Sequence, residues 1–228
     1  MDDVVAAIVL AAGRSVRMGT EDKLWADLNG EPVIGRTVRG IAAMPELDVL
    51  VIVAPQVLHE RLASLVPARD GLEVRCVAGG ARRQDSVAAG LAAVIEADWV
   101  LVHDGARPLV TAELCAVVLA AAREHGAAVP VLPVTDTLKR VDEDGLILET
   151  IDRASVRAVQ TPQAFDAMRL RAAHAVTERD ATDDASMIEA GGGTVVVVEG
   201  DPANLKLTTP TDLVIARALV AARGEGKS

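Results

Sequence analysis

The chain has 228 residues, half of them hydrophobic, which is enough to build the core of one large α/β domain. Its net charge is −10 and only 1% of its residues are aromatic, so base stacking and a basic surface, the usual means of holding nucleic acid, are missing. The composition argues against a DNA or RNA partner, and an anionic substrate would need cations gathered locally.

The cysteines and the N-terminus indicate the cellular compartment of the protein. Cys76 and Cys115 fit no metal-ligand spacing, and a reducing cytosol is the simplest setting for them. The chain begins with acidic Asp2 and Asp3 instead of the basic region of a signal peptide. No apolar run approaches the length of a membrane span. We therefore expect a cytoplasmic protein with no membrane partner.

Strand and helix patterns alternate along the chain. Strands are expected near residues 4–11, 48–54, 72–78, 98–103, 127–132 and 194–199, and helices near 32–44, 56–66, 84–97, 111–125, 166–176, 184–190 and 210–223. Near-continuous Val, Ile and Leu strands between helices predict a mostly parallel sheet covered on both faces, in a Rossmann-like α/β fold. No linker, repeat or low-complexity tract divides the chain, so residues 1–228 are expected to form a single domain, with a β-arm at about 133–160 inserted in it.

One segment, residues 133–160, breaks this alternation. Apolar and polar residues alternate there on both sides of an acidic turn, 142–145, that ends in a glycine, which predicts a β-hairpin. A hairpin is only marginally stable alone and needs a surface to pack on. We expect an arm that leaves the domain and packs on a second subunit; the alternative is a hairpin folded against its own domain.

The first strand pattern ends abruptly in a loop of small residues. Ala12 and Gly13 let backbone N–H groups approach a ligand closely, and Arg17 and Lys23 add two cations. At the end of the first strand of an open α/β sheet, this combination predicts a polyphosphate-binding loop. The loop matches neither the dinucleotide fingerprint nor a Walker A sequence. An ordinary strand-to-helix turn is the alternative.

A second glycine-rich turn, residues 79–86, also stands between a strand and a helix. Gly79 and Gly80 again permit close backbone approach, and Ser86 offers a hydroxyl near the helix start. The turn could line a pocket for a base or a sugar. It could equally be a plain turn in which polar side chains support the helix N-terminus.

A carboxylate ends the strongly apolar strand near 98–103. Asp104 is expected to face the ligand crevice, where it could hold a metal or accept hydrogen bonds from sugar hydroxyls. Arg107 could pair with a carboxylate and brace the loop. His103 alternates with Asp104 and is expected to point elsewhere, with a structural role. Further along, Lys206 is an isolated cation between a strand pattern and a helix pattern, and alone it could be a solvated surface lysine.

Taken in order, these groups resemble the 2-C-methyl-D-erythritol 4-phosphate cytidylyltransferase family of the non-mevalonate isoprenoid pathway. The resemblance runs from about residue 5 to residue 220. It is carried by LAAGRSVRM, GG-x-x-R-x-D-S at 79–86, HDGARP at 103–108, PVTDTLK at 133–139, DR at 152–153, QTPQ-x-F at 160–165, TDDAS at 182–186 and NLKLT at 204–208.

The resemblance implies that CMP passes from CTP to 2-C-methyl-D-erythritol 4-phosphate, giving 4-diphosphocytidyl-2-C-methyl-D-erythritol and pyrophosphate. It implies Mg²⁺ held mainly by substrate phosphates, and a homodimer in which each arm completes the partner's site. The catalytic cations would be Arg17, Lys23 and Lys206. The nucleotide contacts would come from Leu10, Ala11, Ala12, Gly13, Gly80, Ser86 and Gly105, and the acceptor contacts from Asp104, Lys206 and, on the partner's arm, Thr137 and Arg153.

The chain departs from the family pattern at three positions. Asp22 stands where proline often precedes the lysine, Gly105 where alanine is common, and Ala81 where an acidic residue can occur. None of these replaces a motif cation, so an active enzyme is expected. The alternatives are a ribitol 5-phosphate cytidylyltransferase and, from another class, a catalytically silent nucleotide-binding domain. A dehydrogenase is disfavoured because the glycine fingerprint is missing.

Overall fold

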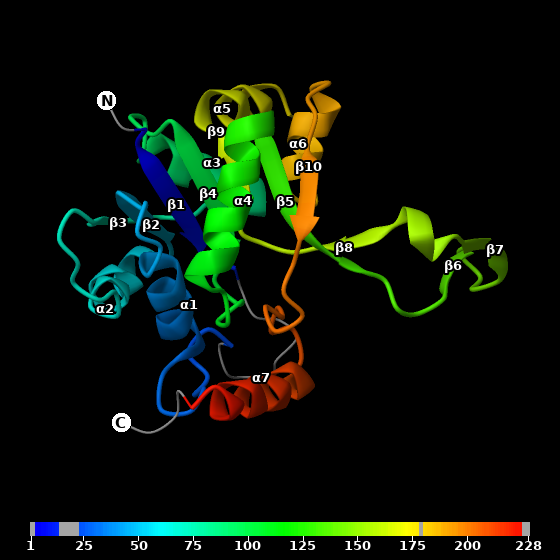
Figure 1. Cartoon of the computed structure of the whole chain (residues 1–228), viewed down its shortest axis with the longest axis horizontal. Helices are drawn as coiled ribbons and strands as arrows, with labels where there is room; N and C mark the ends of the chain where they lie inside the picture. The colour runs from blue at the N-terminus through cyan, green and yellow to red at the C-terminus, as the bar shows by residue number, and fades with distance from the viewer. Residues whose placement is uncertain (1–2, 14–22, 178–179, 225–228) are drawn as a thin grey trace.

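The computed structural model describes residues 3–13, 23–177 and 180–224 and is built around one eight-stranded sheet (Figure 1). The strand order is β10-β5-β9-β4-β1-β2-β3, and β8 pairs with the end of β5. The strands are β1 Val5–Leu10, β2 Val49–Val53, β3 Glu73–Val77, β4 Trp99–Asp104, β5 Ala127–Pro133, β8 Arg157–Val159, β9 Gln163–Asp166 and β10 Val196–Glu199.

The centre of the sheet is parallel, as the sequence predicts. Strands β4, β1, β2 and β3 pair in parallel, and β10 pairs in parallel with β5. Every residue of β2 is buried, as are those of β1 up to Val9. Strands buried on both faces must be apolar throughout, and β-branched side chains suit the pleated backbone. The predicted strand ranges agree with the observed ones to within about two residues.

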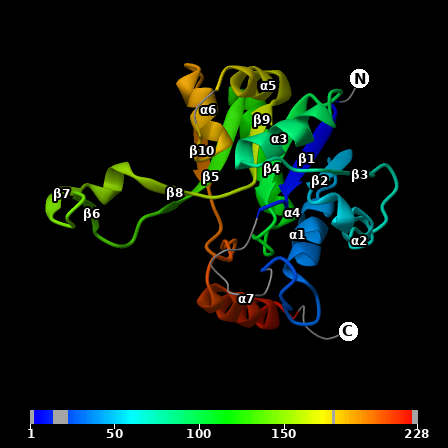
Figure 2. The same cartoon turned by 180° about the vertical axis from the view of Figure 1, so that it is seen from behind.

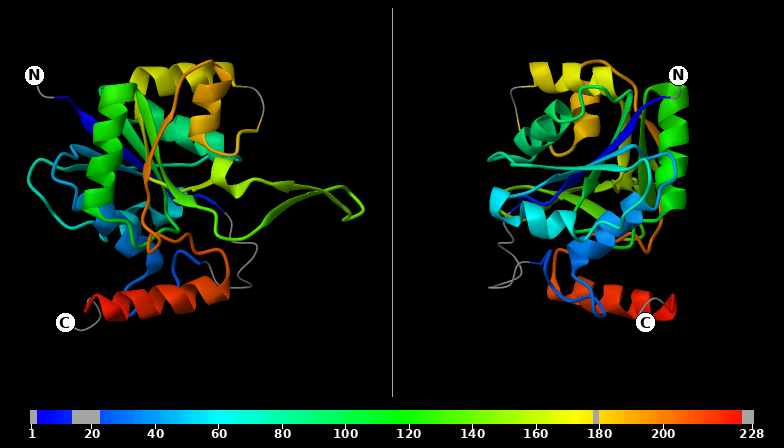
Figure 3. Two further views of the ribbon diagram at one scale, coloured as in Figure 1. Left: turned by 45° about the vertical axis from the view of Figure 1, so that its right-hand side comes forward. Right: turned by 90° about the vertical axis from the view of Figure 1, so that its left-hand side faces the viewer.

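Helices cover both faces of the sheet (Figure 3). One core cluster joins the sheet to α1, α2 and α4, and a second joins it to α3, α5 and α6. The helices are α1 Val33–Ala42, α2 His59–Ala63, α3 Arg83–Ala92, α4 Ala112–His125, α5 Ala167–Val176, α6 Asp184–Ala190 and α7 Pro210–Ala222, with 3₁₀ turns η1 Gln56–Leu58 and η2 Arg153–Ser155. Within the described residues, none of these helices has the length and hydropathy needed to cross a membrane.

Helix α7 lies beyond the carboxyl ends of the parallel strands (Figure 1). Its Ala216 and Val220 form a small separate core with Leu28, Leu207 and neighbouring side chains. Leu28 belongs to a tight turn at Asn29–Gly30, where both residues have positive φ, as a two-residue hairpin turn requires. The small core therefore ties the segment that follows Lys23 to the segment that carries Lys206.

Strand β9 is the part of the sheet that the sequence analysis did not predict. It lies antiparallel between β4 and β5, in the middle of the sheet. It has only four residues, one of them Gln163, and so it lacks the apolar run by which the other strands are recognised. Tertiary contacts stabilise it instead, since Phe165 is fully buried and the Gln163 amide donates to Asp183 (2.7 Å).

The arm predicted at 133–160 projects from the body of the molecule (Figure 2). Its root is the antiparallel pair of β5 and β8, and its tip is a hairpin of β6 (Leu138–Val141) and β7 (Ile147–Ile151). Gly145, at φ +81°, closes the turn. Leu146, Ile147 and Leu148 are each at least 60% exposed, so the tip presents apolar surface that its own domain does not cover.

Candidate active site

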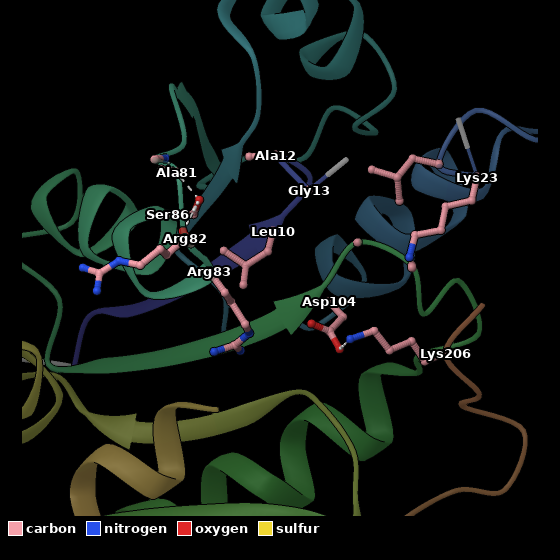
Figure 4. Close-up of a pocket in the computed structure, with 14 residues that line it drawn as sticks. Leu10, Ala12, Gly13, Lys23, Ala81, Arg82, Arg83, Ser86, Asp104 and Lys206 are labelled. Atoms are coloured by element: carbon pink, nitrogen blue, oxygen red, sulfur yellow. Dashed lines mark hydrogen bonds and ion pairs between the residues drawn. The ribbon is translucent and has the colours of Figure 1, made fainter. Parts of the chain in front are cut away.

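The carboxyl ends of the parallel strands surround a cavity of about 680 Å³ (Figure 4). The segments after β1, β3, β4 and β10 supply its walls, which is where open α/β sheets bind ligands. Its lining residues are Leu10, Ala12, Gly13, Lys23, Leu24, Gly80, Ala81, Arg82, Arg83, Ser86, Asp104, Gly105, Ala106 and Lys206. Among these described residues, four carry positive charge and one is a carboxylate, although the chain as a whole is acidic.

Gly79 brings the first and second predicted loops into contact. A Cβ at Gly79 would lie 2.4 Å from the Cβ of Ala12 and 2.9 Å from the Ser86 hydroxyl oxygen. Ser86 accepts a hydrogen bond from the Gly80 N–H and donates one to the Arg82 carbonyl, both at 3.2 Å. The absence of a side chain at Gly79 therefore lets Ala12 and Ser86 form adjacent parts of one wall.

Asp104 ends β4 and is the carboxylate at this cavity. Lys206 Nζ lies 3.0 Å from Asp104 Oδ2, and Arg107 Nε lies 3.5 Å from the same oxygen. Burial opposes ionisation of Asp104, but the positive charges of Lys206, Arg83 and Arg107 outweigh it and lower its pKa to about 2. Asp104 is therefore an anion at neutral pH, and it accepts hydrogen bonds.

The segment that carries Lys206 is fixed by hydrogen bonds to buried side chains. Arg107 donates to the Asn204 carbonyl (2.8 Å), and Asn204 donates through Nδ2 to the Thr161 carbonyl (2.8 Å). The Leu207 N–H donates to the Ala106 carbonyl (2.8 Å). Lys206 itself is 41% exposed, so its ammonium is held at the cavity and stays accessible. In Figure 4 the ammonium groups of Lys23 and Lys206 both turn toward the end of β4, where Asp104 lies.

His103 is structural, as predicted. It is fully buried, and its Nδ1 lies 3.1 Å from the Thr161 hydroxyl, which accepts from the Asp104 N–H (3.1 Å). Since the Arg107 carbonyl can only accept, His103 carries its proton on Nε2 and donates it there (3.2 Å), and the unprotonated Nδ1 accepts from the Thr161 hydroxyl. Burial lowers the pKa of His103 to about 4. The neutral ring thus braces the loop from Asp104 to Arg107.

This buried histidine makes stability depend on pH. The unfolded chain binds a proton at His103 below pH 6.5 and the folded chain only below about pH 4, so stability is lost as pH falls through this window. The loss is on the order of 3 kcal/mol across the window. We expect His103→Gln, which keeps one donor and one acceptor, to weaken the pH dependence of the unfolding free energy in urea. If the unfolding free energies of the wild type and the variant changed with pH by the same amount, the role of His103 would be contradicted.

A second cavity of about 530 Å³ adjoins the first. The two share Arg83, Asp104 and Lys206. The rest of the second cavity combines hydroxyl and amide side chains, among them Thr161, Gln163 and Ser186, with valines of the sheet, the carboxylates of Asp183 and Glu189, and the positive charges of Arg107 and Arg157. A ligand with hydroxyl groups and a phosphate fits this lining. We call the shared residues Arg83, Asp104 and Lys206 the seam.

The structure brings most of the predicted site residues together. Leu10, Ala12, Gly13, Lys23, Gly80, Ser86, Asp104, Gly105 and Lys206 all line the first cavity. Ala11 is buried behind it, with its N–H donating to the Val53 carbonyl (2.8 Å). Thr137 and Arg153 lie on the arm, where the Arg153 guanidinium donates to the Thr135 carbonyl. Arg17 lies outside the described residues.

Sequence reasoning assigned no role to three residues of this region. Arg83 lines both cavities, Thr161 joins Asp104 to His103, and Asn204 anchors the Lys206 segment. Each stands inside a motif quoted for the family resemblance, but nothing in those motifs tells which side chain turns toward the cavity. The motif GG-x-x-R-x-D-S singles out Arg83, and the structure adds its direction: Arg82 instead pairs with Asp85 (2.7 Å) and Asp180 (3.2 Å).

A Rossmann-like fold with a cation-lined cavity at the strand ends defines the class as a nucleotidyltransferase. The family model for IspD, 2-C-methyl-D-erythritol 4-phosphate cytidylyltransferase, matches residues 5–222. The chain belongs to this family and is a cytidylyltransferase.

Known proteins are similar to this chain over nearly its whole length. The 2-C-methyl-D-erythritol 4-phosphate cytidylyltransferase of Rhodococcus jostii is 46% identical, with 95% of each chain covered. The crystal structure of 4-diphosphocytidyl-2C-methyl-D-erythritol synthase from Anaerococcus prevotii superimposes with a TM-score of 0.85 at 30% identity, with 96% of both chains covered. That of the Thermus thermophilus cytidylyltransferase gives 0.75 at 36% identity, with 94% and 98% covered.

Proposed function

We propose that this chain transfers CMP from CTP to 2-C-methyl-D-erythritol 4-phosphate, forming 4-diphosphocytidyl-2-C-methyl-D-erythritol and pyrophosphate in isoprenoid biosynthesis. The observation that carries the proposal is the seam, where Asp104, Lys206 and Arg83 border two cavities at once. One cavity takes the nucleotide and the other the sugar-alcohol phosphate, so the two phosphates meet at the seam. Family membership supports the choice of substrates.

The reaction needs charge neutralisation more than proton transfer. A phosphate oxygen of the acceptor attacks the α-phosphorus of CTP, and the bond from that phosphorus to the bridging oxygen of the pyrophosphate breaks. The acceptor phosphate is already an anion at neutral pH, so no general base is required. The obstacle is repulsion between two anions. We propose that Lys23, Lys206 and Arg17 offset it and stabilise the charge that develops at the α-phosphorus.

The residues present also fit a magnesium ion. Within the described residues no group of three His, Cys, Asp or Glu side chains comes together, and Mg²⁺ in nucleotide enzymes is commonly held by substrate phosphates plus one or two carboxylates. Asp104, the ionised carboxylate at the cavity, is the side chain that would contribute. When bound, Mg²⁺ would neutralise charge on the triphosphate.

The glycine-rich wall is the part of the cavity that we assign to cytosine. We expect Gly79→Ala to raise the KM for CTP on the order of tenfold, because overpacking typically costs about 1–3 kcal/mol. The new methyl group must push Ala12 or Ser86 out of the wall. Gly191→Ala is the matched control, since its Cβ would meet only ordinary contacts of 3.5 Å and longer. An unchanged KM in steady-state kinetics would remove Gly79 from the nucleotide site.

The arm is proposed to act in the partner subunit. It projects away from the body that carries both cavities of its own chain (Figure 2), and its tip exposes Leu146, Ile147 and Leu148. A second copy would cover these side chains, and the two-fold symmetry of a homodimer would bring each arm to the other's site. On this proposal Thr137 and Arg153 bind the acceptor phosphate across the interface.

A turnover assay tests the proposed function. Pyrophosphate release is measured with CTP alone, with CTP and 2-C-methyl-D-erythritol 4-phosphate, and with CTP and ribitol 5-phosphate. We expect release with the first acceptor and a much lower rate with ribitol 5-phosphate. Preference for ribitol 5-phosphate would favour that cytidylyltransferase, and tight CTP binding without release would favour a silent binding domain.

The thiols Cys76 and Cys115, both free, suit the cytoplasm as the place of action.

A further inference from the structure

The motif T-D-D-A-S at 182–186 contains a carboxylate that the proposed reaction does not use. Asp183 caps α6 by accepting from the Ser186 N–H (3.0 Å), which is the ordinary role of an acidic residue before a helix. Asp184 does something else. Its side chain turns inward and is fully buried. A buried carboxylate is costly unless it is paired with positive charge.

Both oxygens of Asp184 have partners on other helices. Oδ2 lies 2.7 Å from Nη1 of Arg83, the first residue of α3, so the two charges form an ion pair, although their relative angle is not that of a hydrogen bond. Oδ1 lies 3.0 Å from Nε2 of His174 on α5, which must donate, since a carboxylate only accepts. Asp184 thus contacts His174 on one side and Arg83, which is one of the seam residues, on the other.

Arg83 and its neighbour Arg82 have different surroundings. Arg82 is paired with surface carboxylates, whereas Arg83 is 26% exposed, borders both cavities and helps to hold Asp104 ionised. Figure 4 shows the Arg82 guanidinium pointing away from Asp104, while the Arg83 side chain extends in a different direction. An arginine has many rotamers, and fixing one in advance spares that entropy when an anion binds.

We infer that Asp184 is a positioning residue, which holds the Arg83 guanidinium at the seam so that it faces the phosphates of the reactants. The inference rests on the proposed function and deepens it by adding Arg83 to the cations of the site. His174 supports the arrangement by fixing the orientation of the Asp184 carboxylate. Because both cavities border Arg83, its displacement should weaken the binding of CTP and of the acceptor alike.

The test compares Asp184→Asn, Arg83→Met and the double variant with the wild type. We expect each single variant to weaken CTP binding, measured by calorimetry, on the order of tenfold. We expect a similar loss in kcat/KM for both substrates. The double variant should lose no more than either single one, because both substitutions remove the same placed guanidinium. Glu96→Gln, which breaks an acid–arginine pair of 2.6 Å with Arg75 away from the cavities, is the control that should change neither value.

Several outcomes would overturn the inference. One is an Arg83→Met variant with unchanged CTP affinity, which decides the matter even if Asp184→Asn does not fold. Another is an Asp184→Asn variant that is merely less stable, with normal CTP affinity well below its melting temperature. A double variant whose loss of CTP affinity is the product of the two single losses would also contradict it. The calorimetric comparison needs no acceptor, so it remains decisive if the wild type fails to turn over and the proposed function falls.

Discussion

Replacing Lys206 by methionine should lower kcat/KM for pyrophosphate release on the order of 10²–10³-fold, the loss typical of removing one group that stabilises transition-state charge. Methionine keeps an unbranched stem but removes the ammonium, which lies 3.0 Å from Asp104 and borders both cavities. The loss should appear in kcat as well as in the KM for CTP, because Lys206 borders both cavities before the reaction and also faces the charge that develops at the α-phosphorus during the transfer.

Arg123→Met is a suitable control for the Lys206 variant. It also removes one positive charge, but Arg123 lies at the end of α4 and pairs with Glu46 and Asp3, at the amino-terminal end of the sheet. Assays of pyrophosphate release on both variants, with melting temperatures recorded in parallel, distinguish a loss of catalysis from a loss of folding. A folded Lys206→Met protein with near-normal turnover would contradict the assignment of the seam as the reaction centre.

Mixing two impaired variants should restore activity. Lys206→Met damages the body of the site and Arg153→Ala damages the arm, which is proposed to bind the acceptor phosphate of the partner's site. In a mixed dimer, the subunit with an intact Lys206 receives an intact arm from its partner, so one of its two sites is complete. Random exchange makes half of the dimers mixed, and activity should rise to about one quarter of the wild-type value at low acceptor concentration.

Each parent sample supplies the baseline for this experiment. Homodimers of either variant contain no complete site, so their activities must stay low when they are measured apart under the same conditions. Subunit exchange is followed with two affinity tags, and the doubly tagged dimer, in which one site of two is complete, should show about one half of the wild-type activity after purification. If the arm served its own subunit, the mixture would show only the mean of the two parents, and the proposal of shared sites would be wrong.

Most of the fold could be predicted because its central strands, β1, β2 and β4, are almost wholly buried. The valine- and isoleucine-rich runs of β1 and β2 have no polar face, and this is the pattern of a parallel sheet between helices. The arm could be predicted from its alternation and its Gly145 turn. Strand β9 could not, because four residues including Gln163 carry no periodicity of their own. It is held by pairing on both sides and by the burial of Phe165.

The site was predictable as a set of motifs but not as a geometry. Small residues after β1 and the carboxylate after β4 indicate the strand ends, and the structure places them at one cavity. Lys206 alone resembled a surface lysine, and only its distance to Asp104 separates the two interpretations. Arg83 and Asp184 are 101 positions apart in the sequence, and no local pattern can show that they form an ion pair.

A crystal structure of the chain with 4-diphosphocytidyl-2-C-methyl-D-erythritol would test the central claim most directly. The claim is that two negatively charged reactants occupy adjoining cavities and react where these share Asp104, Lys206 and Arg83. We predict the cytidine beside Gly80 and Ser86 in the first cavity, the sugar alcohol in the second, and the diphosphate within hydrogen-bonding distance of Lys206 Nζ. A diphosphate remote from Lys206, or both halves of the product in one cavity, would contradict the account.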